Sequence, residues 1–392
     1  MNREEFIKKL ALSSAGLALL PSFLQSCSKE EILVNFSGKV IIVGGGAAGM
    51  FAALTLNHFG IDFELLEAQE QLGGRVKKQE GFADFPIDLG AEWIHAGTNV
   101  FAQMLKYGNA EGTVNVAPYD PEIVHLFKNG KRFEVDIGNN FYAENKFSDT
   151  TWYDFFEDFV IPEIHDKVVL NKVVNEIDYT EPQVQITTSE GLTYHADKVI
   201  VTVPIKILQK GTISFIPLLN SDVQNSIDAI SMPDGIKVFM EFKERFYPDI
   251  LLINSPTSAS EKTFYNAAFK KDSSKHIFAL FTVGEPSTAY TSLATDEEVI
   301  LKILEELDEI YEGQASLNYL GHVIQNWSNE EHIGGSYSFA NTDFSQLQVP
   351  LKNAINSKLY FAGEALSDYY SATVHGAADS GIETVEKIIQ GG

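Results

Sequence analysis

The feature that most constrains the fold is a glycine-rich loop between a predicted buried strand and a predicted helix. Residues 39–43 form an apolar, β-branched run, and Gly44, Gly46 and Gly49 follow it with the spacing GxGxxG. This spacing permits a tight turn, close approach of the backbone to a pyrophosphate, and close packing of the helix on the strand. The helix, predicted to run to residue 59, directs its positive N-terminal end at the same phosphates.

A second strand completes this unit. Gly60 ends the helix, residues 62–66 form the strand, and Glu67 follows it. A carboxylate at this position can accept hydrogen bonds from the ribose hydroxyls of an adenine dinucleotide. Residues 39–67 therefore predict a βαβ dinucleotide-binding unit, which by itself does not distinguish FAD from NAD.

Two further segments bear on the choice of cofactor. Gly74 and Arg75, in the run Leu-Gly-Gly-Arg, come soon after Glu67, where a second glycine turn and an arginine reach the same pyrophosphate. Near the other end of the chain, residues 359–362 predict a strand that leads into Gly363 and Glu364. Residues 372–381 then open a helix that is rich in small side chains.

In these segments the sequence resembles the flavin-dependent amine oxidase family, which includes monoamine oxidases, polyamine oxidases, lysine-specific histone demethylases and L-amino-acid oxidases. The resemblance is strong over residues 38–98 and 325–392 and weaker between them. Residues 90–95 and 373–377 are most similar to the branch that contains polyamine oxidases and histone demethylases. The family implies an α/β fold, in which a Rossmann-type FAD-binding domain of the two-dinucleotide kind carries an inserted α+β substrate domain.

The resemblance also implies where the cofactor and the domain boundaries lie. We expect an FAD-binding domain of residues 38–85, 166–204 and 325–392, and a substrate domain of residues 86–165 and 205–324. Glu364 is expected to bind hydroxyls near the ribityl and pyrophosphate groups. The helix N-terminus at Val374 is expected to face flavin N1 and O2, where reduced flavin carries negative charge. The full set expected to bind FAD is Gly44, Gly46, Ala48, Gly49, Glu67, Ala68, Gly74, Arg75, Gly363, Glu364, Thr373 and Val374.

Catalytic positions follow from the same resemblance. Lys237 matches the family lysine that reaches flavin N5 through a water, where a buried positive charge stabilises superoxide and reduced flavin. The alternative is an exposed lysine on an alternating strand, and Lys243 lies close enough to compete for the role. Tyr337 matches one wall of the aromatic cage, whereas the opposite wall falls on Thr373 and predicts a wider pocket. Ser336 stands where monoamine oxidases carry the flavin-linking cysteine, so FAD is expected to be noncovalent.

Glu92 and His95 lie where polyamine oxidases place polar groups that recognise distal nitrogens. A carboxylate suits an ammonium, and a histidine that titrates near neutral pH can help to deprotonate the substrate. Alternatively, His95 caps a turn before Gly97. We therefore expect oxidation of a small-molecule amine, with polyamines as the leading class, by hydride transfer to flavin N5 and reduction of molecular oxygen to hydrogen peroxide.

Three other functions remain open at this point. An L-amino-acid oxidase needs an arginine to hold the substrate carboxylate, and neither Arg132 nor Arg245 lies in a matching motif. A dehydrogenase or desaturase passes its electrons to an acceptor other than oxygen. A flavin-binding lipoprotein has no turnover of its own. The formal net charge of −25 argues against a nucleic-acid partner, whose phosphates are repelled.

Residues 1–27 predict a signal peptide that ends in a lipoprotein cleavage box. Lys8 and Lys9 precede an apolar run over residues 10–20, and the segment closes with Leu-Gln-Ser before Cys27. We expect lipid attachment at Cys27 and export to the periplasm or cell envelope, with this anchor as the only contact with a membrane. The alternative is an amphipathic helix with an incidental cysteine. Cys27 is the only cysteine of the chain, so no intrachain disulfide can form.

Overall fold

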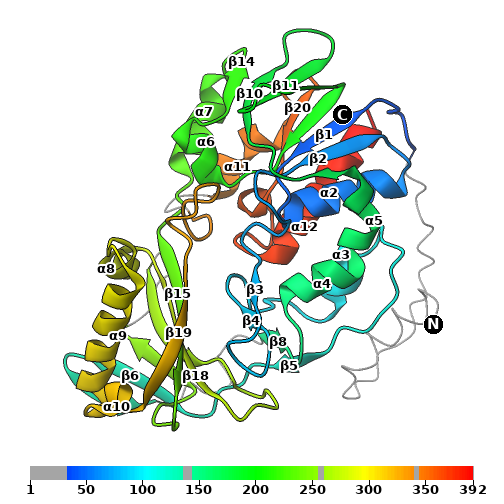
Figure 1. Cartoon of the computed structure of the whole chain (residues 1–392). Helices are drawn as coiled ribbons and strands as arrows, with labels where there is room; N and C mark the ends of the chain where they lie inside the picture. Colours follow the sequence, from blue (N-terminus) through cyan, green and yellow to red (C-terminus); the bar gives the residue numbers. More distant parts are fainter. Residues whose placement is uncertain (1–32, 136–143, 255–259, 340–343, 392) are drawn as a thin grey trace.

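The computed structural model of the chain describes residues 33–135, 144–254, 260–339 and 344–391 (Figure 1). The predicted signal peptide and Cys27 lie outside the described residues. Within these ranges, none of the helices combines the length and the apolar character needed to cross a bilayer.

A five-stranded parallel sheet organises the upper part of the molecule in Figure 1. Its order is β20-β13-β1-β2-β9, and each neighbouring pair is parallel. Its central strands are buried on both faces, which explains their continuous apolar sequence. The strands are β1 (Val40–Val43), β2 (Phe63–Leu66), β9 (Val168–Val169), β13 (Lys198–Val201) and β20 (Leu359–Phe361).

Alternate residues of these strands belong to two different cores. Val40 and Ile42 pack against a helical layer on one face, whereas Ile41 and Val43 pack against a second sheet and two helices on the other. The helical layer contains α2 (Ala47–His58), α3 (Asn99–Met104), α4 (Trp152–Phe159), α5 (Ile161–Ile164) and α12 (Val374–Ile389). The opposite layer contains α6 (Ile205–Lys210), α7 (Ser221–Ala229) and the strands β10 (Val174–Asp178), β11 (Val184–Thr188), β12 (Thr193–Ala196) and β14 (Ser214–Ile216).

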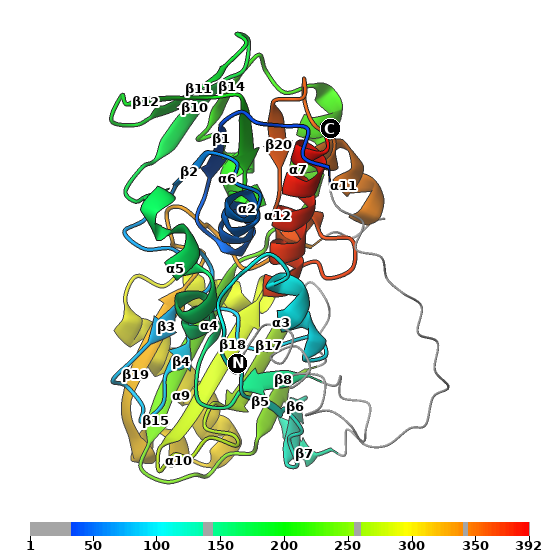
Figure 2. The same ribbon diagram turned by 90° about the vertical axis from the view of Figure 1, so that its right-hand side faces the viewer.

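Helix α12 lies directly beside α2, as Figure 2 shows. The two helices approach so closely that a Cβ atom on Gly381 would lie 2.2 Å from the carbonyl oxygen of Ala48. Only glycine fits there, and this contact brings the N-terminal ends of both helices to the same edge of the parallel sheet.

The lower part of the molecule is a seven-stranded sheet with the order β19-β15-β18-β17-β16-β6-β7. Neighbouring strands are antiparallel except for β16 and β6. The strands are β6 (Val124–Lys128), β7 (Lys131–Glu134), β15 (Gly235–Phe242), β16 (Ile250–Ile253), β17 (Glu261–Asn266), β18 (His276–Val283) and β19 (Tyr319–Asn326).

The two faces of this sheet contact different partners. Val238 and Met240 of β15 pack with the apolar side of α9 (Asp296–Tyr311). This helix begins with a capping box, in which Thr295 and Glu298 each bind the other's backbone N–H. Because side chains alternate along a strand, Lys237 and its neighbours on the opposite face point toward the parallel-sheet part.

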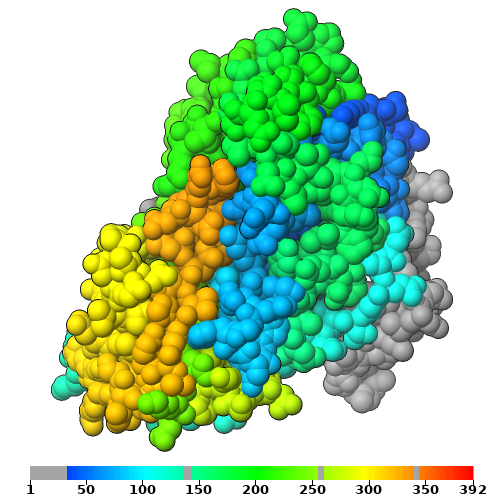
Figure 3. Space-filling model, viewed as in Figure 1, coloured from blue at the N-terminus to red at the C-terminus, as the bar shows by residue number. Residues whose placement is uncertain are grey.

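Short elements complete the fold. They are β3 (Lys78–Gln79), β4 (Ile87–Asp88), β5 (Val116–Pro118), β8 (Asn145–Phe147), α8 (Thr288–Thr291), α10 (Gln314–Asn318), α11 (Phe344–Lys352) and the 3₁₀ turns η2 (His165–Lys167), η3 (Glu285–Ser287) and η4 (Glu364–Leu366). On the face shown in Figure 3, the light-blue segment after β2 and the orange segment after β19 pack together where the two parts meet.

The packing differs from the predicted domain boundaries in two places. The sequence pattern predicts residues 86–165 and 205–324 in the substrate domain. Instead, α3 and α4 join the core around α2, and α6 and α7 join the core on the other face of the parallel sheet. Each helix buries apolar side chains in one of these two cores. An apolar stripe in the sequence predicts that a helix is buried but does not specify its packing partner.

Candidate active site

A cavity of about 460 Å³ lies between the parallel sheet and the seven-stranded sheet. It opens at the carboxyl ends of β1, β2 and β13, the edge where open α/β sheets bind ligands. Of the predicted site residues, all except Gly49 line this cavity: Gly44, Gly46, Ala48, Glu67, Ala68, Gly74, Arg75, Glu92, His95, Lys237, Tyr337, Gly363, Glu364, Thr373 and Val374. The structure thus brings together residues from both ends of the chain.

The first glycine loop forms an open cradle on the cavity wall. Gly44 has a φ of +110°, and a Cβ atom on Gly49 would lie 1.9 Å from the carbonyl oxygen of Gly44. By contrast, a Cβ atom on Gly46 would meet nothing within 4 Å. Gly46 is the N-cap of α2, so the free N–H groups of the first turn face this open space. The cradle fits a pyrophosphate, which such N–H groups bind.

The second glycine turn extends this surface. The N–H of Gly73 donates to the carbonyl oxygen of Gly45 at 2.9 Å, and Gly46 and Gly73 form a parallel bridge. A Cβ atom on Gly74 would lie only 3.4 Å from the Cα of Gly46. The two turns therefore form one continuous backbone surface without side chains.

Glu67 holds the first loop in place. Its Oε2 accepts from the N–H of Gly45 at 2.5 Å, and its Oε1 accepts from the N–H of Gln69 at 2.8 Å. Burial raises the pKa of Glu67 above its usual range, while these N–H donors oppose the shift. A carboxylate has about four acceptor sites, so Glu67 keeps capacity for a ribose hydroxyl.

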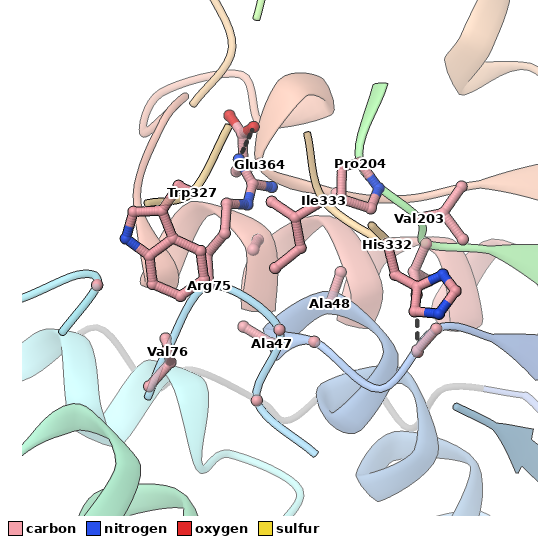
Figure 4. Close-up of a pocket in the computed structure, with 18 of the residues that line it drawn as sticks. Ala47, Ala48, Arg75, Val76, Val203, Pro204, Trp327, His332, Ile333 and Glu364 are labelled. Carbon is pink, nitrogen blue, oxygen red and sulfur yellow. Dashed lines mark hydrogen bonds and ion pairs between the residues drawn. The ribbon is translucent and has the colours of Figure 1, made fainter. Parts of the chain in front are cut away.

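Glu364 has a different environment from the one that the resemblance implies. Its Oε1 accepts from Arg75 Nη1 at 3.0 Å and from the N–H of Ser338 at 3.1 Å, while its Oε2 accepts from Ser338 Oγ at 2.5 Å and from the N–H of Ala372 at 3.0 Å. These bonds use the carboxylate fully, which leaves no acceptor site for ribityl hydroxyls. Figure 4 shows the Arg75–Glu364 pair above the start of α2, between Trp327 and Ile333.

The hydroxyl of Thr373 also makes hydrogen bonds within the protein. It is the N-cap of α12, and its Oγ1 accepts from the N–H of Gly376 at 3.0 Å and donates to the carbonyl oxygen of Tyr370 at 2.7 Å. The hydroxyl is therefore committed to the cap and is not free to contact a substrate. Val374 follows it on the cavity wall, so the positive end of a 16-residue helix faces the cavity.

Lys237 is 2% exposed, which excludes an exposed position on the strand, whereas Lys243 is exposed. Burial lowers the pKa of Lys237, but the adjacent Glu92 favours its charged form. Its Nζ donates to three oxygens, which are the carbonyls of Asp88 (2.8 Å) and Gly90 (3.0 Å) and Oε2 of Glu92 (2.7 Å).

Glu92 is occupied by protein groups. Besides Lys237, its carboxylate contacts the Nζ of Lys146 and accepts from Tyr265 Oη at 2.5 Å. Burial by itself would raise the pKa of Glu92, but Lys146 and Lys237 lower it to about 2. A substrate ammonium would have to displace a buried lysine, so this geometry does not support the expected role of Glu92 in binding a distal nitrogen.

The structure adds Lys146, which no sequence motif indicates. It lies on the short strand β8 between Asn145 and Phe147, yet it is 6% exposed. Its Nζ lies near three ring centroids, those of Trp93 (5.3 Å), Tyr119 (5.2 Å) and Tyr265 (5.3 Å). The aromatic residues come from distant segments, so only the tertiary fold reveals this cation site.

His95 and Tyr337 line the cavity on the side of the seven-stranded sheet. The side chain of His95 is 47% exposed, and its Nδ1 lies 2.9 Å from Glu144 Oε1. This contact differs from the alternative in which His95 caps the turn before Gly97. Burial, together with the charges of Glu261 and Glu364, raises the pKa of Tyr337, which keeps its phenol neutral.

The sequence of the chain is similar to those of several known proteins. The chain is 25% identical over 435 residues to human lysine-specific histone demethylase 2, covering 89% of this chain and 53% of the demethylase. It is 24% identical to maize polyamine oxidase 1, covering 96% of this chain and 95% of the oxidase. The chain thus spans about half the length of the histone demethylases that it matches, and nearly all of the plant oxidase.

Solved structures share the fold at low sequence identity. A putrescine oxidase bound to putrescine matches with a TM-score of 0.74 and 15% identity, covering 90% of this chain and 99% of that one. A cyclohexylamine oxidase from Brevibacterium oxydans matches with a TM-score of 0.73 and the same identity. These likenesses confirm the predicted fold class. The family model described as flavin containing amine oxidoreductase matches residues 47–163 and 162–389, and the chain therefore belongs to this family.

Proposed function

We propose that the protein is an oxidase that uses noncovalent FAD to oxidise an amine and passes the electrons to molecular oxygen. One observation carries the proposal. A single cavity is lined by the glycine cradle around Gly46, the N-terminus of α12 at Val374, the buried Lys237, and Tyr337. The cradle suits the pyrophosphate of a dinucleotide, and the seven-stranded sheet supplies the wall against which a substrate is held.

The N-terminus of α12 and the buried lysines next to Glu92 both favour negative charge in the cavity. A bound flavin supplies the hydride acceptor. The N-terminus of α12 presents a partial positive charge, equivalent to about half an elementary charge. Burial and the nearby Glu92 raise the pKa of Asp88 well above its usual range. Glu92 is the one carboxylate that contacts both Lys146 and Lys237, so this buried cluster contains two lysines and one glutamate.

The cavity suits an amine better than an amino acid. Within the described part of the chain, Arg75 is the only arginine in the lining, and its guanidinium is bound to Glu364. Arg132 binds the carbonyl oxygen of Ile310, and Arg245 pairs with a carboxylate on the far side of the sheet. A substrate carboxylate therefore has no free arginine to pair with in the cavity, and burial of an unpaired carboxylate costs several kcal/mol.

An anaerobic assay tests this proposal. Purified, flavin-loaded protein is mixed with di- and polyamines, monoamines or common L-amino acids, and loss of flavin absorbance is followed. We expect an amine to bleach the flavin faster than any L-amino acid, and air to restore the colour with formation of hydrogen peroxide. Faster bleaching by an amino acid contradicts the substrate class. A colour that returns only with an added electron acceptor identifies a dehydrogenase.

Ser336 supports noncovalent attachment. Its Oγ donates to the carbonyl oxygen of Pro233 at 2.9 Å, and a serine offers no thiol for a flavin thioether. Acid precipitation of the purified protein is expected to release the flavin into the supernatant. Flavin that stays in the pellet points to a covalent link.

Replacement of Gly46 by leucine is expected to abolish retention of FAD without unfolding the protein. Because nothing lies within 4 Å of a Cβ on Gly46, the new side chain enters the cradle rather than the core. The melting temperature of the flavin-free protein and the flavin content per chain measure the two effects. Gly49→Ala is the contrasting variant, because its Cβ would collide with the backbone of Gly44 and lower the melting temperature itself. Full flavin content in Gly46→Leu contradicts the assignment of the cradle.

We also propose export with a lipid anchor at Cys27. The basic residues, apolar run and cysteine of residues 1–27 support it. In the native cell, the wild type is expected in the membrane fraction and Cys27→Ala is expected to remain unprocessed. A soluble, full-length wild type in its native cell contradicts the anchor.

A further inference from the structure

We propose that Lys271 and Lys146 supply a proton for the reduction of oxygen, and that this proton reaches Lys237 through the carboxylate of Glu92. This inference rests on the proposed oxidase function and deepens it. Reduction of oxygen to hydrogen peroxide takes up two electrons and two protons. Hydride transfer from the amine brings two electrons and one proton to the flavin, and oxygen receives all three. One further proton therefore has to come from another source.

Glu92 lies between two cavities. One is the large cavity described above, and the other has a volume of about 10 Å³. Of the residues that the structure describes, Glu92 alone lines both cavities, whereas Asp88, Lys146 and Lys271 line only the small one. The volume of the small cavity is about the minimum that holds one water molecule, and these charged side chains can bind such a water.

Direct contacts join the lysines on either side of Glu92. The Nζ of Lys237 donates to Oε2 of Glu92 at 2.7 Å, and Oε1 of the same carboxylate contacts the Nζ of Lys146. The hydroxyl of Tyr265 also donates to Oε2, at 2.5 Å, and fixes the orientation of the carboxylate. Both lysines are buried, and only Lys237 lines the large cavity. A proton can therefore pass from Lys146 to Lys237 through a single carboxylate.

Lys271 connects the small cavity with the surface. It is half-buried, and its neighbours in the chain, Lys270 and Asp272, are exposed. The Nζ of Lys271 donates to the carbonyl oxygen of Phe147 at 2.7 Å, and Phe147 follows Lys146 on β8. Lys271 thus reaches the small cavity from the solvent side, where one water can bridge it to Lys146.

The surroundings of these groups favour release of a proton. Burial lowers the pKa of Lys237 and of Lys271, although the charge of Glu92 opposes the shift in both. Lys146 and Lys237 lower the pKa of Glu92 to about 2. The carboxylate of Glu92 therefore does not retain a proton that it accepts from one lysine, and it passes this proton to the other.

The transfers balance over one turnover. Lys237 donates a proton to the reduced oxygen, so that an N–H bond breaks, an O–H bond forms, and the lysine becomes a neutral amine. Lys146 restores the ammonium of Lys237 through Glu92, and Lys271 restores that of Lys146 through the water in the small cavity. Lys271 then takes a proton from solvent, which returns each residue to its initial charge.

The test measures reoxidation in variants of Lys271, which lies at the surface end of this path. Flavin-loaded protein is reduced by light without an amine, and it is then mixed with oxygen in H₂O or D₂O. Lys271→Met removes the proton donor. Lys271→Arg keeps the positive charge, but a guanidinium does not release its proton near neutral pH. Lys275→Met is the matched control, because Lys275 lies in the same segment, pairs with Glu241 and lines neither cavity.

We expect both Lys271→Met and Lys271→Arg to slow reoxidation by about tenfold, with a larger solvent isotope effect because proton transfer then limits the rate. Lys146→Met is expected to behave in the same way, and Lys275→Met should match the wild type. The inference is overturned if Lys271→Met reoxidises at the wild-type rate or with an unchanged isotope effect. It is also overturned if Lys271→Arg restores the rate, since the charge of Lys271 alone then explains its effect.

Hydrogen exchange tests the path without turnover. Protein that contains oxidised flavin and ¹⁵N-labelled lysines is transferred to D₂O, and exchange of the Lys237 ammonium is followed by NMR. The signal that is missing from Lys237→Met identifies this group. We expect both variants of Lys271 to slow the exchange and Lys275→Met to leave it unchanged. Exchange at the wild-type rate in both variants of Lys271 contradicts the path.

The two proposals fail in different ways. If the reduced flavin does not react with oxygen but exchange at Lys237 depends on Lys271, the path exists and the oxidase function is refuted, together with use of the path for oxygen. If oxygen reoxidises the flavin equally fast in the wild type and in both variants of Lys271, the oxidase function stands and the path is refuted.

Discussion

Lys237→Met is expected to slow reoxidation of the reduced flavin by oxygen by about a hundredfold, while flavin reduction by the substrate changes by less than about tenfold. Oxygen reduction develops negative charge next to the flavin, and Lys237 is a buried lysine that shares the carboxylate of Glu92 with Lys146. Methionine has a similar length and no charge. Its introduction removes the positive charge of Lys237 and leaves Glu92 paired with Lys146 alone.

Stopped-flow measurements of the two half-reactions check this prediction. Reduction is followed without oxygen, and reoxidation is followed after mixing reduced protein with aerated buffer. Lys243→Met is the matched control, since Lys243 lies on the exposed surface a short distance along the chain, and both rates should match the wild type. Equal losses in both half-reactions of Lys237→Met assign Lys237 to substrate positioning instead.

Glu92→Gln is expected to lower the free energy of unfolding by about 3 kcal/mol at neutral pH. The variant leaves Lys146 and Lys237 buried without their shared carboxylate. The pKa of Glu92 falls from 4.5 to about 2 on folding, so its contribution to stability is complete above about pH 4.5 and is lost as the pH falls toward 2. The difference between wild type and variant should therefore shrink over this window.

Denaturant titrations between pH 7 and the lowest pH at which both proteins fold measure this difference. Glu241→Gln serves as a control, because Glu241 pairs with Lys275 at the surface of the seven-stranded sheet and such pairs contribute little to stability. A small effect at pH 7, or a difference that does not change with pH, contradicts the buried network. Should Glu92→Gln instead be stable and weaken only diamine binding, the role expected from the sequence is restored.

The cofactor-binding residues could be predicted from the sequence, because the motifs that identify them lie within short segments of the chain. The spacing of Gly44, Gly46 and Gly49 follows from backbone geometry over one turn, and Glu67 follows at the end of the next strand. The sequence pattern predicts helices over residues 296–311 and from about 374 to 389, and α9 and α12 occupy these bounds. It also predicts one helix over residues 152–164, which the structure divides at Val160 into α4 and α5. Periodicity does not reveal such a local break.

The contacts on the substrate side of the cavity could not be predicted from the sequence, because they join residues that are distant in the chain. Nothing near Glu92 indicates that Lys146 will occupy it, and nothing near Lys146 indicates its aromatic surroundings. A motif gives the position of a carboxylate but not its partners.

The carboxylate of Glu364 has a consequence for the order in which the site is assembled. It joins Arg75 of the second glycine turn, Ser338 beyond β19, and Ala372 just before α12. The edge strand β20 and the helix α12 that packs on α2 also come from the last part of the chain. A nascent chain that ends at residue 350 contains the first glycine loop, but it lacks Glu364 and the helix α12. We therefore expect tight loading of the cofactor to follow completion of synthesis, and we expect a chain truncated before Glu364 to lose its flavin on purification.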